Sequence, residues 1–157
     1  MRYVLIDRIH SLEPGRALTG VKNVTMSDAL LTQYAPDVWA LPPTMLLESM
    51  AQAAGVLVVS TVDFTAQPVL AKIQPFSARR LAVPGDQVTV SAHLRELRGA
   101  GCQADAIARI GESVIAEASI FLGLAPLAEK SRGRLRSHLA RTFPGWFDEP
   151  AVLEAHS

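Results

Sequence analysis

The sequence predicts an α+β domain in which a curved antiparallel sheet wraps around one long buried helix. The helix is expected over Leu41 to Val59, the longest apolar run in the chain, which opens with prolines that suit a first helical turn. The strands are expected in segments whose apolar and polar residues alternate with a period of two. Because no strand–helix–strand alternation occurs along the chain, we expect the sheet to be antiparallel.

The expected helix is apolar on nearly every side, so it should be buried all round. Glu48 is the exception, because a carboxylate inside a buried helix is costly unless it is paired, neutralised or facing a cavity. Gln52 lies one turn later on the same face. Glu48 therefore either complements the helix dipole or belongs to a functional site. These polar residues also argue against a membrane span.

Six segments are expected to form strands, and turn residues separate them. The first two should form a hairpin around Glu13-Pro14-Gly15, and the last three should form a meander. Thr25 to Trp39 is irregular and is expected to be a loop that leads into the helix. The expected strands are Tyr3 to His10, Arg16 to Val24, Val69 to Ile73, Gln87 to Leu97, Gln103 to Ile110 and Ser113 to Leu124.

The chain changes character near Pro126, which predicts a sheet-and-helix domain over residues 1–126 and a basic helical extension over residues 127–157. In the segment Glu129 to Arg141, apolar residues recur every four positions, which is typical of an amphipathic helix with its arginines outside. Two interpretations of this extension stay open. It packs on the sheet or on a partner subunit, or it docks an acidic partner.

Composition excludes several classes of function. The 157 residues carry 15 basic and 15 acidic side chains, and this zero net charge argues against a nucleic-acid binder. The single Cys102 forms no internal disulfide, and the absence of a secretory signal makes the cytoplasm the expected location. The four histidines and one cysteine show no metal-ligand spacing, so no metal is expected.

Several short blocks of sequence occur together in one order along residues 3–124. They are Val4-Leu5-Ile6-Asp7-Arg8, Leu12-Glu13-Pro14-Gly15, Lys22-Asn23-Val24-Thr25, Glu48-Ser49-Met50-Ala51-Gln52-Ala53-Ala54-Gly55, and Arg80 followed by Val83-Pro84-Gly85-Asp86. In this combination the sequence resembles the 3-hydroxyacyl-[acyl-carrier-protein] dehydratases of fatty acid synthesis. That resemblance implies a hot-dog fold, which agrees with the sheet and helix predicted from periodicity.

The resemblance also implies a lyase activity and its partners. Members of the family bind an acyl chain as a thioester on carrier-protein phosphopantetheine, in a tunnel beside the central helix at a dimer interface, and remove water between the α and β carbons. The expected partners are therefore an acyl carrier protein or acyl thioester, and a second copy of the chain in a homodimer or an assembly of dimers. No cofactor beyond the phosphopantetheine that carries the substrate is expected.

Two functional positions depart from the family pattern. The family has His-Phe-Pro-Gly and then Pro-Gly ahead of the catalytic Glu, and ungapped counting places Tyr34 at the histidine and Pro43 at the second glycine. A phenol is a much weaker base than imidazole at neutral pH, and proline has no N–H to polarise the thioester carbonyl. His10 and His93 lie on expected strands, and no other histidine is placed convincingly to compensate.

Three hypotheses follow from the resemblance. The chain is a divergent dehydratase in which Glu48 and Tyr34 exchange roles, an acyl thioesterase in which Glu48 acts with a donor from Thr44, or a non-catalytic partner subunit that pairs with an active paralogue. In each case Arg79, Arg80 and the basic tail are expected to bind the phosphopantetheine phosphate at the tunnel mouth. The expected substrate-binding residues are Pro43, Thr44, Gln52, Arg79 and Arg80.

Overall fold

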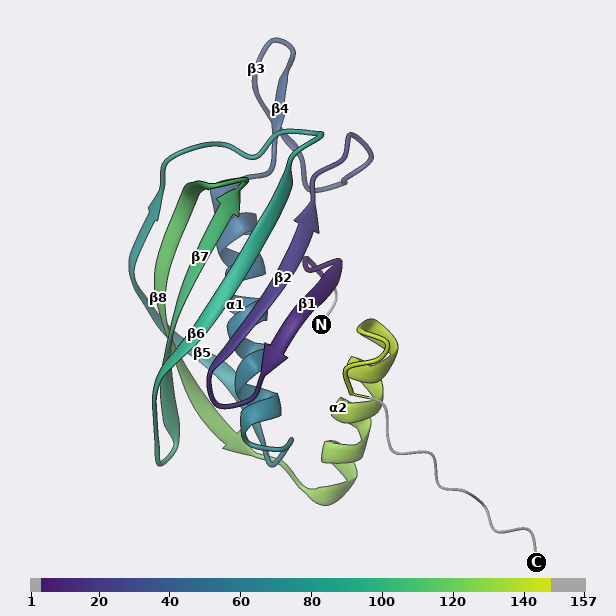
Figure 1. Cartoon of the computed structure of the whole chain (residues 1–157), viewed down its shortest axis with the longest axis vertical. Coiled ribbons are helices and arrows are strands. Elements are labelled where there is room, and N and C mark those ends of the chain that lie inside the picture. Colours follow the sequence, from purple (N-terminus) through teal and green to yellow (C-terminus); the bar gives the residue numbers. More distant parts are fainter. Residues whose placement is uncertain (1–3, 148–157) are drawn as a thin grey trace, which may run out of the picture.

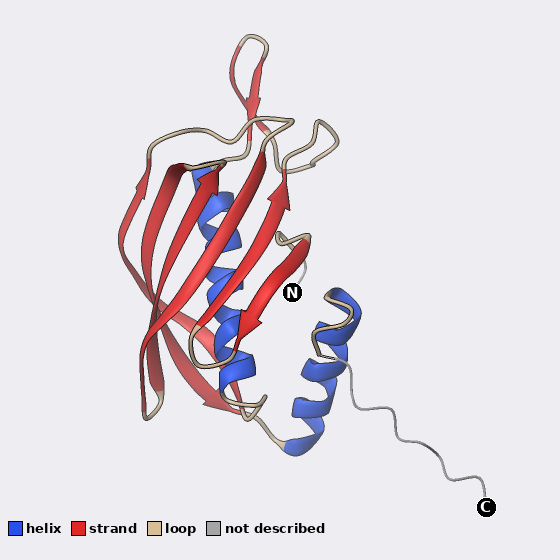
Figure 2. Ribbon diagram, in the orientation of Figure 1, coloured by secondary structure: helices blue, strands red, loops and turns tan. Residues whose placement is uncertain are grey.

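The computed structural model describes residues 4–147, and its main feature is a six-stranded antiparallel sheet with the strand order β1-β2-β6-β7-β8-β5. The sheet curves around helix α1, as the sequence predicts (Figures 1 and 2). The strands of this sheet are β1 (Arg8–Glu13), β2 (Ala17–Asn23), β5 (Ala66–Ala78), β6 (Gln87–Arg98), β7 (Gly101–Ile110) and β8 (Ser113–Pro126).

Helix α1 (Pro43–Thr61) packs along the concave face of the sheet, and Leu46, Met50 and Leu57 are almost fully buried there. The expectation that the helix is buried all round is wrong for the single chain. Glu48 is exposed and Gly55 is only half-buried, on a stripe at helical spacing that the sheet does not cover. One curved sheet can enclose only part of a helix. Length and composition alone would allow α1 to cross a membrane, but 56% of its most apolar window is buried inside this fold.

The predicted loop over Thr25 to Trp39 contains a small hairpin, formed by β3 (Thr32–Ala35) and β4 (Val38–Ala40). It projects beyond the end of the main sheet (Figure 1). Asp37 makes its turn with a φ of 63°, a left-handed conformation that Asp tolerates better than most residues. Pro36 and the shortness of both strands make this hairpin hard to predict from the sequence.

Strand β5 is an edge strand and is longer than the predicted Val69 to Ile73, since it runs over 13 residues. Pro68 and Pro75 interrupt its apolar pattern, but an edge strand tolerates proline because one side of its backbone has no strand partner. At the other end of the chain β1 starts at Arg8, and Tyr3 of the predicted first strand lies outside the described residues.

Helix α2 (Glu129–Thr142) forms where the basic extension was predicted and packs beside the C-terminal half of α1 (Figure 1). Leu139, Phe143 and Phe147 join the same hydrophobic core as α1. Arg136 Nη2 lies 2.7 Å from Asp63 Oδ1, and its guanidinium carbon lies 4.3 Å from the centroid of the Phe64 ring. These contacts fix α2 against the end of α1. The division at residue 126 stays a prediction, and residues 148–157 of the extension lie outside the described residues.

Candidate active site beside helix α1

A cavity of about 240 Å³ lies between α1, the start of β5 and α2. Its walls are mainly apolar, and Glu48 and His138 are the titratable side chains among them. The α1 residues of the wall recur at helical spacing, so one face of α1 forms one side of the cavity. The lining residues are Glu48, Ala51, Gln52, Gly55, Val56, Val59, Gln67, Pro68, Leu70, Leu122, Leu135, His138 and Leu139.

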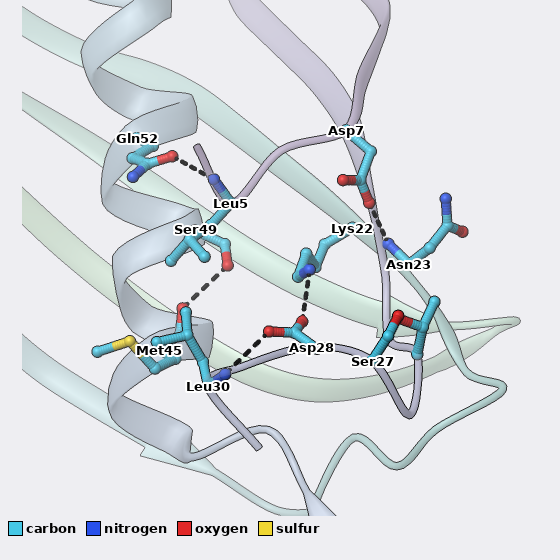
Figure 3. Close-up of polar contacts among 11 residues, drawn as sticks. Leu5, Asp7, Lys22, Asn23, Ser27, Asp28, Leu30, Met45, Ser49 and Gln52 are labelled. Carbon is cyan, nitrogen blue, oxygen red and sulfur yellow. Dashed lines mark hydrogen bonds and ion pairs between the residues drawn. The ribbon is translucent and has the colours of Figure 1, made fainter. Parts of the chain in front are cut away.

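Gln52 orients the carboxylate of Glu48. Its Nε2 donates a hydrogen bond of 3.4 Å to Glu48 Oε1, one turn away on α1. Its Oε1 accepts a hydrogen bond of 2.9 Å from the backbone N–H of Leu5, which ties the segment before β1 to the helix (Figure 3). Gln52 is buried at 8% exposure, so it is a fixed support for the more exposed Glu48. The sequence prediction that both residues share one face is confirmed.

His138 reaches the cavity from α2, opposite α1. Its Nε2 is the one buried side-chain nitrogen or oxygen within residues 4–147 that makes no hydrogen bond. The sequence did not predict a role for His138, because no histidine was expected to compensate for the missing family histidine. The signal was present: His138 precedes Leu139 and follows Leu135 by three positions, which places it on the apolar face of the predicted helix.

The remaining predicted site residues lie elsewhere in the single chain. Tyr34 is 46% exposed in the projecting β3–β4 hairpin, while Pro43 and Thr44 lie in the first turn of α1. None of the three lines the cavity. The structure therefore brings Glu48 and Gln52 together and leaves Tyr34, Pro43 and Thr44 outside this cavity. Their roles stay predictions.

The two predicted phosphate-binding arginines follow the end of β5 and are each paired with a carboxylate. Arg79 pairs with Glu117, and Arg80 Nη2 lies 3.3 Å from Asp86 Oδ1. Their side chains are 58% and 49% exposed. Both guanidinium groups can still meet a ligand from solvent, although neither lines the cavity. Their role at a tunnel mouth stays a prediction.

A larger hollow of about 420 Å³ lies near the start of β1, and polar groups there already satisfy one another. Lys22 Nζ lies 2.9 Å from Asp28 Oδ2, and both side chains are about nine-tenths buried (Figure 3). Burial raises the pKa of Asp28, but the hydrogen bond from Lys22, the hydrogen bond from the Leu30 N–H and the charge of Lys22 outweigh it. The pKa of Asp28 is therefore lowered. This pair supports the fold, and the smaller cavity beside Glu48 is the better candidate for chemistry.

No group of three or more His, Cys, Asp or Glu side chains within residues 4–147 is arranged to hold a metal ion.

Comparison with known proteins identifies the family. Residues 1–119 match the FabA-like domain, which is three quarters of this chain. The chain belongs to the FabA-like family. Within it, the chain is 31% identical over 119 residues to the 3-hydroxyacyl-[acyl-carrier-protein] dehydratase FabZ of Clostridium tetani, covering 75% of this chain and 84% of that protein. It is 33% identical over 133 residues to the FabZ of Symbiobacterium thermophilum, covering 84% and 94%.

Solved structures share the fold of this FabA-like chain at low sequence identity. One is smu.793 from Streptococcus mutans bound to acetyl CoA, with a TM-score of 0.65 and 14% identity, covering 78% of this chain and 90% of that one. Another is a hypothetical thioesterase from Streptococcus pneumoniae with coenzyme A, with a TM-score of 0.65, 13% identity and the same coverage. The predicted hot-dog fold and the predicted resemblance to the dehydratase family are both confirmed.

Proposed function

We propose that this chain binds an acyl group carried as a thioester, with the acyl chain in the cavity beside α1 and the carbons that react close to Glu48. The observation that carries the proposal is the cavity itself, with an apolar body and one carboxylate held by Gln52. Small-molecule sites are typically apolar hollows with a few placed polar groups. The dehydratases to which the chain is similar are named for acyl groups on a carrier protein, which supports the same substrate class.

The reaction that we propose is a divergent dehydration of a 3-hydroxyacyl thioester. In this reaction one group takes a proton from the α carbon, and another donates a proton to the leaving hydroxyl at the β carbon. Glu48 is one of the two groups. Tyr34 is the second group predicted from the sequence, and it would reach Glu48 of a partner subunit because it stands on a hairpin that projects from its own chain.

The assembly that we propose is a homodimer joined through the free edge of β5. Val69 and Leu70 are 54% and 47% exposed on this edge strand, and one stripe of α1 is left uncovered by its own sheet. A long edge strand with apolar side chains favours pairing with another strand. A second subunit would also cover the open stripe of α1. Pairing with a paralogue instead of an identical copy would suit a non-catalytic partner subunit.

The carrier that we propose is an acyl carrier protein in the cytoplasm, presenting its substrate on phosphopantetheine, with no other cofactor. Arg79 and Arg80 would bind the phosphate through their exposed guanidinium groups. The outer face of α2 adds further positive charge for an acidic carrier. Its exposed basic residues are Lys130, Arg132, Arg134 and Arg141.

A second candidate reaction is hydrolysis of the thioester. Glu48 is exposed in the single chain, so water can reach the carboxylate that would direct its attack. Pro43 offers no N–H to polarise the carbonyl, and the exposed Thr44 hydroxyl is the nearest alternative donor in the first turn of α1.

The test separates these functions by product. A series of 3-hydroxyacyl pantetheine thioesters of increasing chain length is incubated with the wild type and with Glu48→Gln. Enoyl absorbance reports dehydration, free thiol reports hydrolysis, and equilibrium binding of the thioesters is measured in parallel. We expect enoyl product from the wild type and a loss of roughly 10²-fold or more in Glu48→Gln. Thiol release without enoyl product would favour the thioesterase, and binding without either product would favour a non-catalytic subunit. No binding at any chain length would overturn the proposal.

A further inference from the structure

We propose that the far end of the cavity, away from Glu48, binds a hydroxyl group carried by the acyl chain, with His138 Nε2 as its hydrogen-bond partner. This inference rests on the proposed function, because it names the class of substrate that enters the same cavity. The expected substrate is an acyl thioester with a hydroxyl toward the free end of its chain. A plain hydrocarbon chain would offer His138 Nε2 no partner.

The cavity runs along helix α1 from Glu48 toward the C-terminal end of the helix. Its wall residues on α1 extend from Glu48 to Val59, which is roughly 16 Å at the rise of an α-helix. Strand β5 forms another side. A Cβ atom at Gly55 would lie 3.8 Å from Pro68 Cγ, which places Pro68 beside the middle of this wall. The cavity is therefore long enough to have two distinct ends.

His138 belongs to the end that is far from Glu48. On α2, two residues before His138, Arg136 Nη2 lies 2.7 Å from Asp63 Oδ1, and its guanidinium carbon lies 4.3 Å from the centroid of the Phe64 ring. Asp63 and Phe64 follow the last turn of α1, about four turns beyond Glu48. Helix α2 lies beside the C-terminal half of α1 (Figure 1). A ligand that reaches from Glu48 to His138 therefore uses the whole length of the cavity.

Apolar groups separate the two ends. Leu122 of β8 pairs in register with Leu70 of β5, and both line the cavity. The facing residues of α1 between Gln52 and Val59 are also apolar, so this part of the wall suits the methylene groups of an acyl chain. The apolar middle of the wall consists of Ala51, Gly55, Val56, Pro68, Leu70 and Leu122.

The buried polar group at the far end is His138 Nε2. No donor or acceptor within residues 4–147 forms a hydrogen bond with it. Buried polar atoms are nearly always hydrogen-bonded, and one left without a partner is costly. Gln67 also lines the cavity, but it is exposed and can bond to water. Because His138 lines the cavity, a polar group of the bound substrate can supply the missing bond.

A neutral hydroxyl fits this position better than a carboxylate. An imidazole nitrogen donates or accepts according to which nitrogen carries the proton, and a hydroxyl can do the opposite in either case. A buried carboxylate needs a cationic partner. Arg136 of the same helix is engaged by Asp63, and the other titratable side chain that lines the cavity is the acidic Glu48. The substrate class is therefore a hydroxylated acyl chain.

Packing holds His138 in place. Leu139, the next residue, is 2% exposed, and Phe143, one turn later, is 4% exposed. The Thr142 hydroxyl donates a hydrogen bond of 2.8 Å to the His138 carbonyl oxygen. All of α2 lies beyond the residues 1–119 that match the FabA-like domain, so this helix adds a hydrogen-bonding group to the cavity from outside the matched domain.

The test measures equilibrium binding of saturated acyl pantetheine amides, which have no β hydroxyl to lose and resist hydrolysis. Each chain length is offered with a terminal methyl, hydroxyl or carboxylate group. At the length that reaches His138, we expect the wild type to bind the hydroxyl compound roughly three- to tenfold more tightly than its methyl counterpart. His138→Leu should reverse this preference, because the hydroxyl then meets an apolar wall. His10→Leu, which changes an exposed histidine of β1, should bind like the wild type.

A second measurement follows the imidazole ring in the wild-type protein. Nitrogen-15 NMR of histidine-labelled protein reports the hydrogen bonding of His138 Nε2. Its resonance should move when the hydroxyl compound binds and should move much less with the methyl compound. Equal shifts with both compounds would contradict the inference.

The outcomes separate this inference from the proposed function. If the wild type binds methyl compounds and shows no preference for the hydroxyl at any length, the inference is wrong and the proposed function stands. The same conclusion follows if His138→Leu keeps the wild-type preference, or if the carboxylate compound binds more tightly than the hydroxyl compound. If no compound of any length binds, both the inference and the proposed function are wrong.

Discussion

Gln52 and Glu48 form a hydrogen bond of 3.4 Å one turn apart on α1, and the same Gln52 side chain accepts the backbone N–H of Leu5 at 2.9 Å. One amide therefore connects the segment before β1 to the carboxylate that faces the cavity (Figure 3 shows the Gln52–Leu5 part). The position of Glu48 depends on a contact between parts of the chain that are far apart in sequence. Folding of the N-terminal segment and orientation of the proposed catalytic group are thus coupled.

Replacing Gln52 should affect stability and activity together. Gln52→Leu removes the acceptor of the buried Leu5 N–H, which should lower the free energy of unfolding by about 1–3 kcal/mol. It also frees the Glu48 carboxylate, so turnover should fall more than substrate affinity. Urea unfolding and steady-state kinetics measure the two effects. Gln33→Leu, at an exposed position of β3, is the control and should change neither. An unchanged turnover in Gln52→Leu would show that Glu48 needs no support.

Gly55 lines the cavity on the α1 side. A Cβ atom at this position would lie 3.8 Å from Pro68 Cγ, an ordinary contact, so Gly55→Ala fits. Alanine is the better helix former, and we expect a gain of roughly 0.5–1 kcal/mol in the free energy of unfolding. Gly55→Leu should instead fill the cavity and weaken the binding of long acyl chains more than short ones. Equal affinity for all chain lengths in Gly55→Leu would mean that the acyl chain lies elsewhere.

Replacing one member of the buried Lys22–Asp28 pair should lower the free energy of unfolding more than replacing both members. Either Lys22→Met or Asp28→Leu alone leaves one unpaired buried charge and should lower the free energy of unfolding by roughly 3–5 kcal/mol. The double variant should recover most of that loss, because no charge is left without a partner. Denaturant unfolding of all four proteins measures the coupling. If the double variant loses as much free energy of unfolding as the two single variants together, the two charges do not stabilise each other.

Acid should destabilise the fold through two aspartates. Burial raises the pKa of Asp105, but hydrogen bonds from Ser119 and Arg95 and the charges of Arg95 and His93 outweigh it, so its pKa is lowered, as is that of Asp28. A lowered pKa in the folded state stabilises the protein above the unfolded value of about 3.9. This stabilisation is lost as the pH falls through the folded value. Thermal unfolding between about pH 5 and pH 2 should show a smaller decline for Asp28→Asn and Asp105→Asn than for the wild type.

The sequence predicted the parts of the fold that periodicity controls. The apolar run from Leu41 identified α1, and alternation identified β6, β7 and β8, because these strands bury one face of the sheet against α1. The β3–β4 hairpin was not predicted because its strands are short and all of their residues except Ala40 are exposed. Most of β5 was not predicted because Pro68 and Pro75 break the alternation of apolar and polar residues. Prolines are acceptable in this strand because it lies at the edge of the sheet.

The candidate site also contains some residues that the sequence predicted and others that it could not predict. Glu48 and Gln52 could be paired from the sequence because helical spacing puts them on one face. Contact between α1 and α2 depends on tertiary packing, so spacing along the chain could not reveal that His138 shares a cavity with Glu48. Burial of Glu48 was overestimated for a related reason. The sequence shows that α1 is apolar, but only the curvature of the sheet decides which stripe stays uncovered.

The most direct test of the central claim is to locate a bound acyl chain. An acyl pantetheine thioester with a photoreactive diazirine at the end of its chain is irradiated with the wild-type protein, and the cross-linked peptides are identified by mass spectrometry. We predict cross-links to the cavity wall, at Val56 and Val59 of α1 and at Leu135 or Leu139 of α2, and their loss in Gly55→Leu. Cross-links confined to the β3–β4 hairpin or to the outer face of the sheet, and unaffected by Gly55→Leu, would contradict the account.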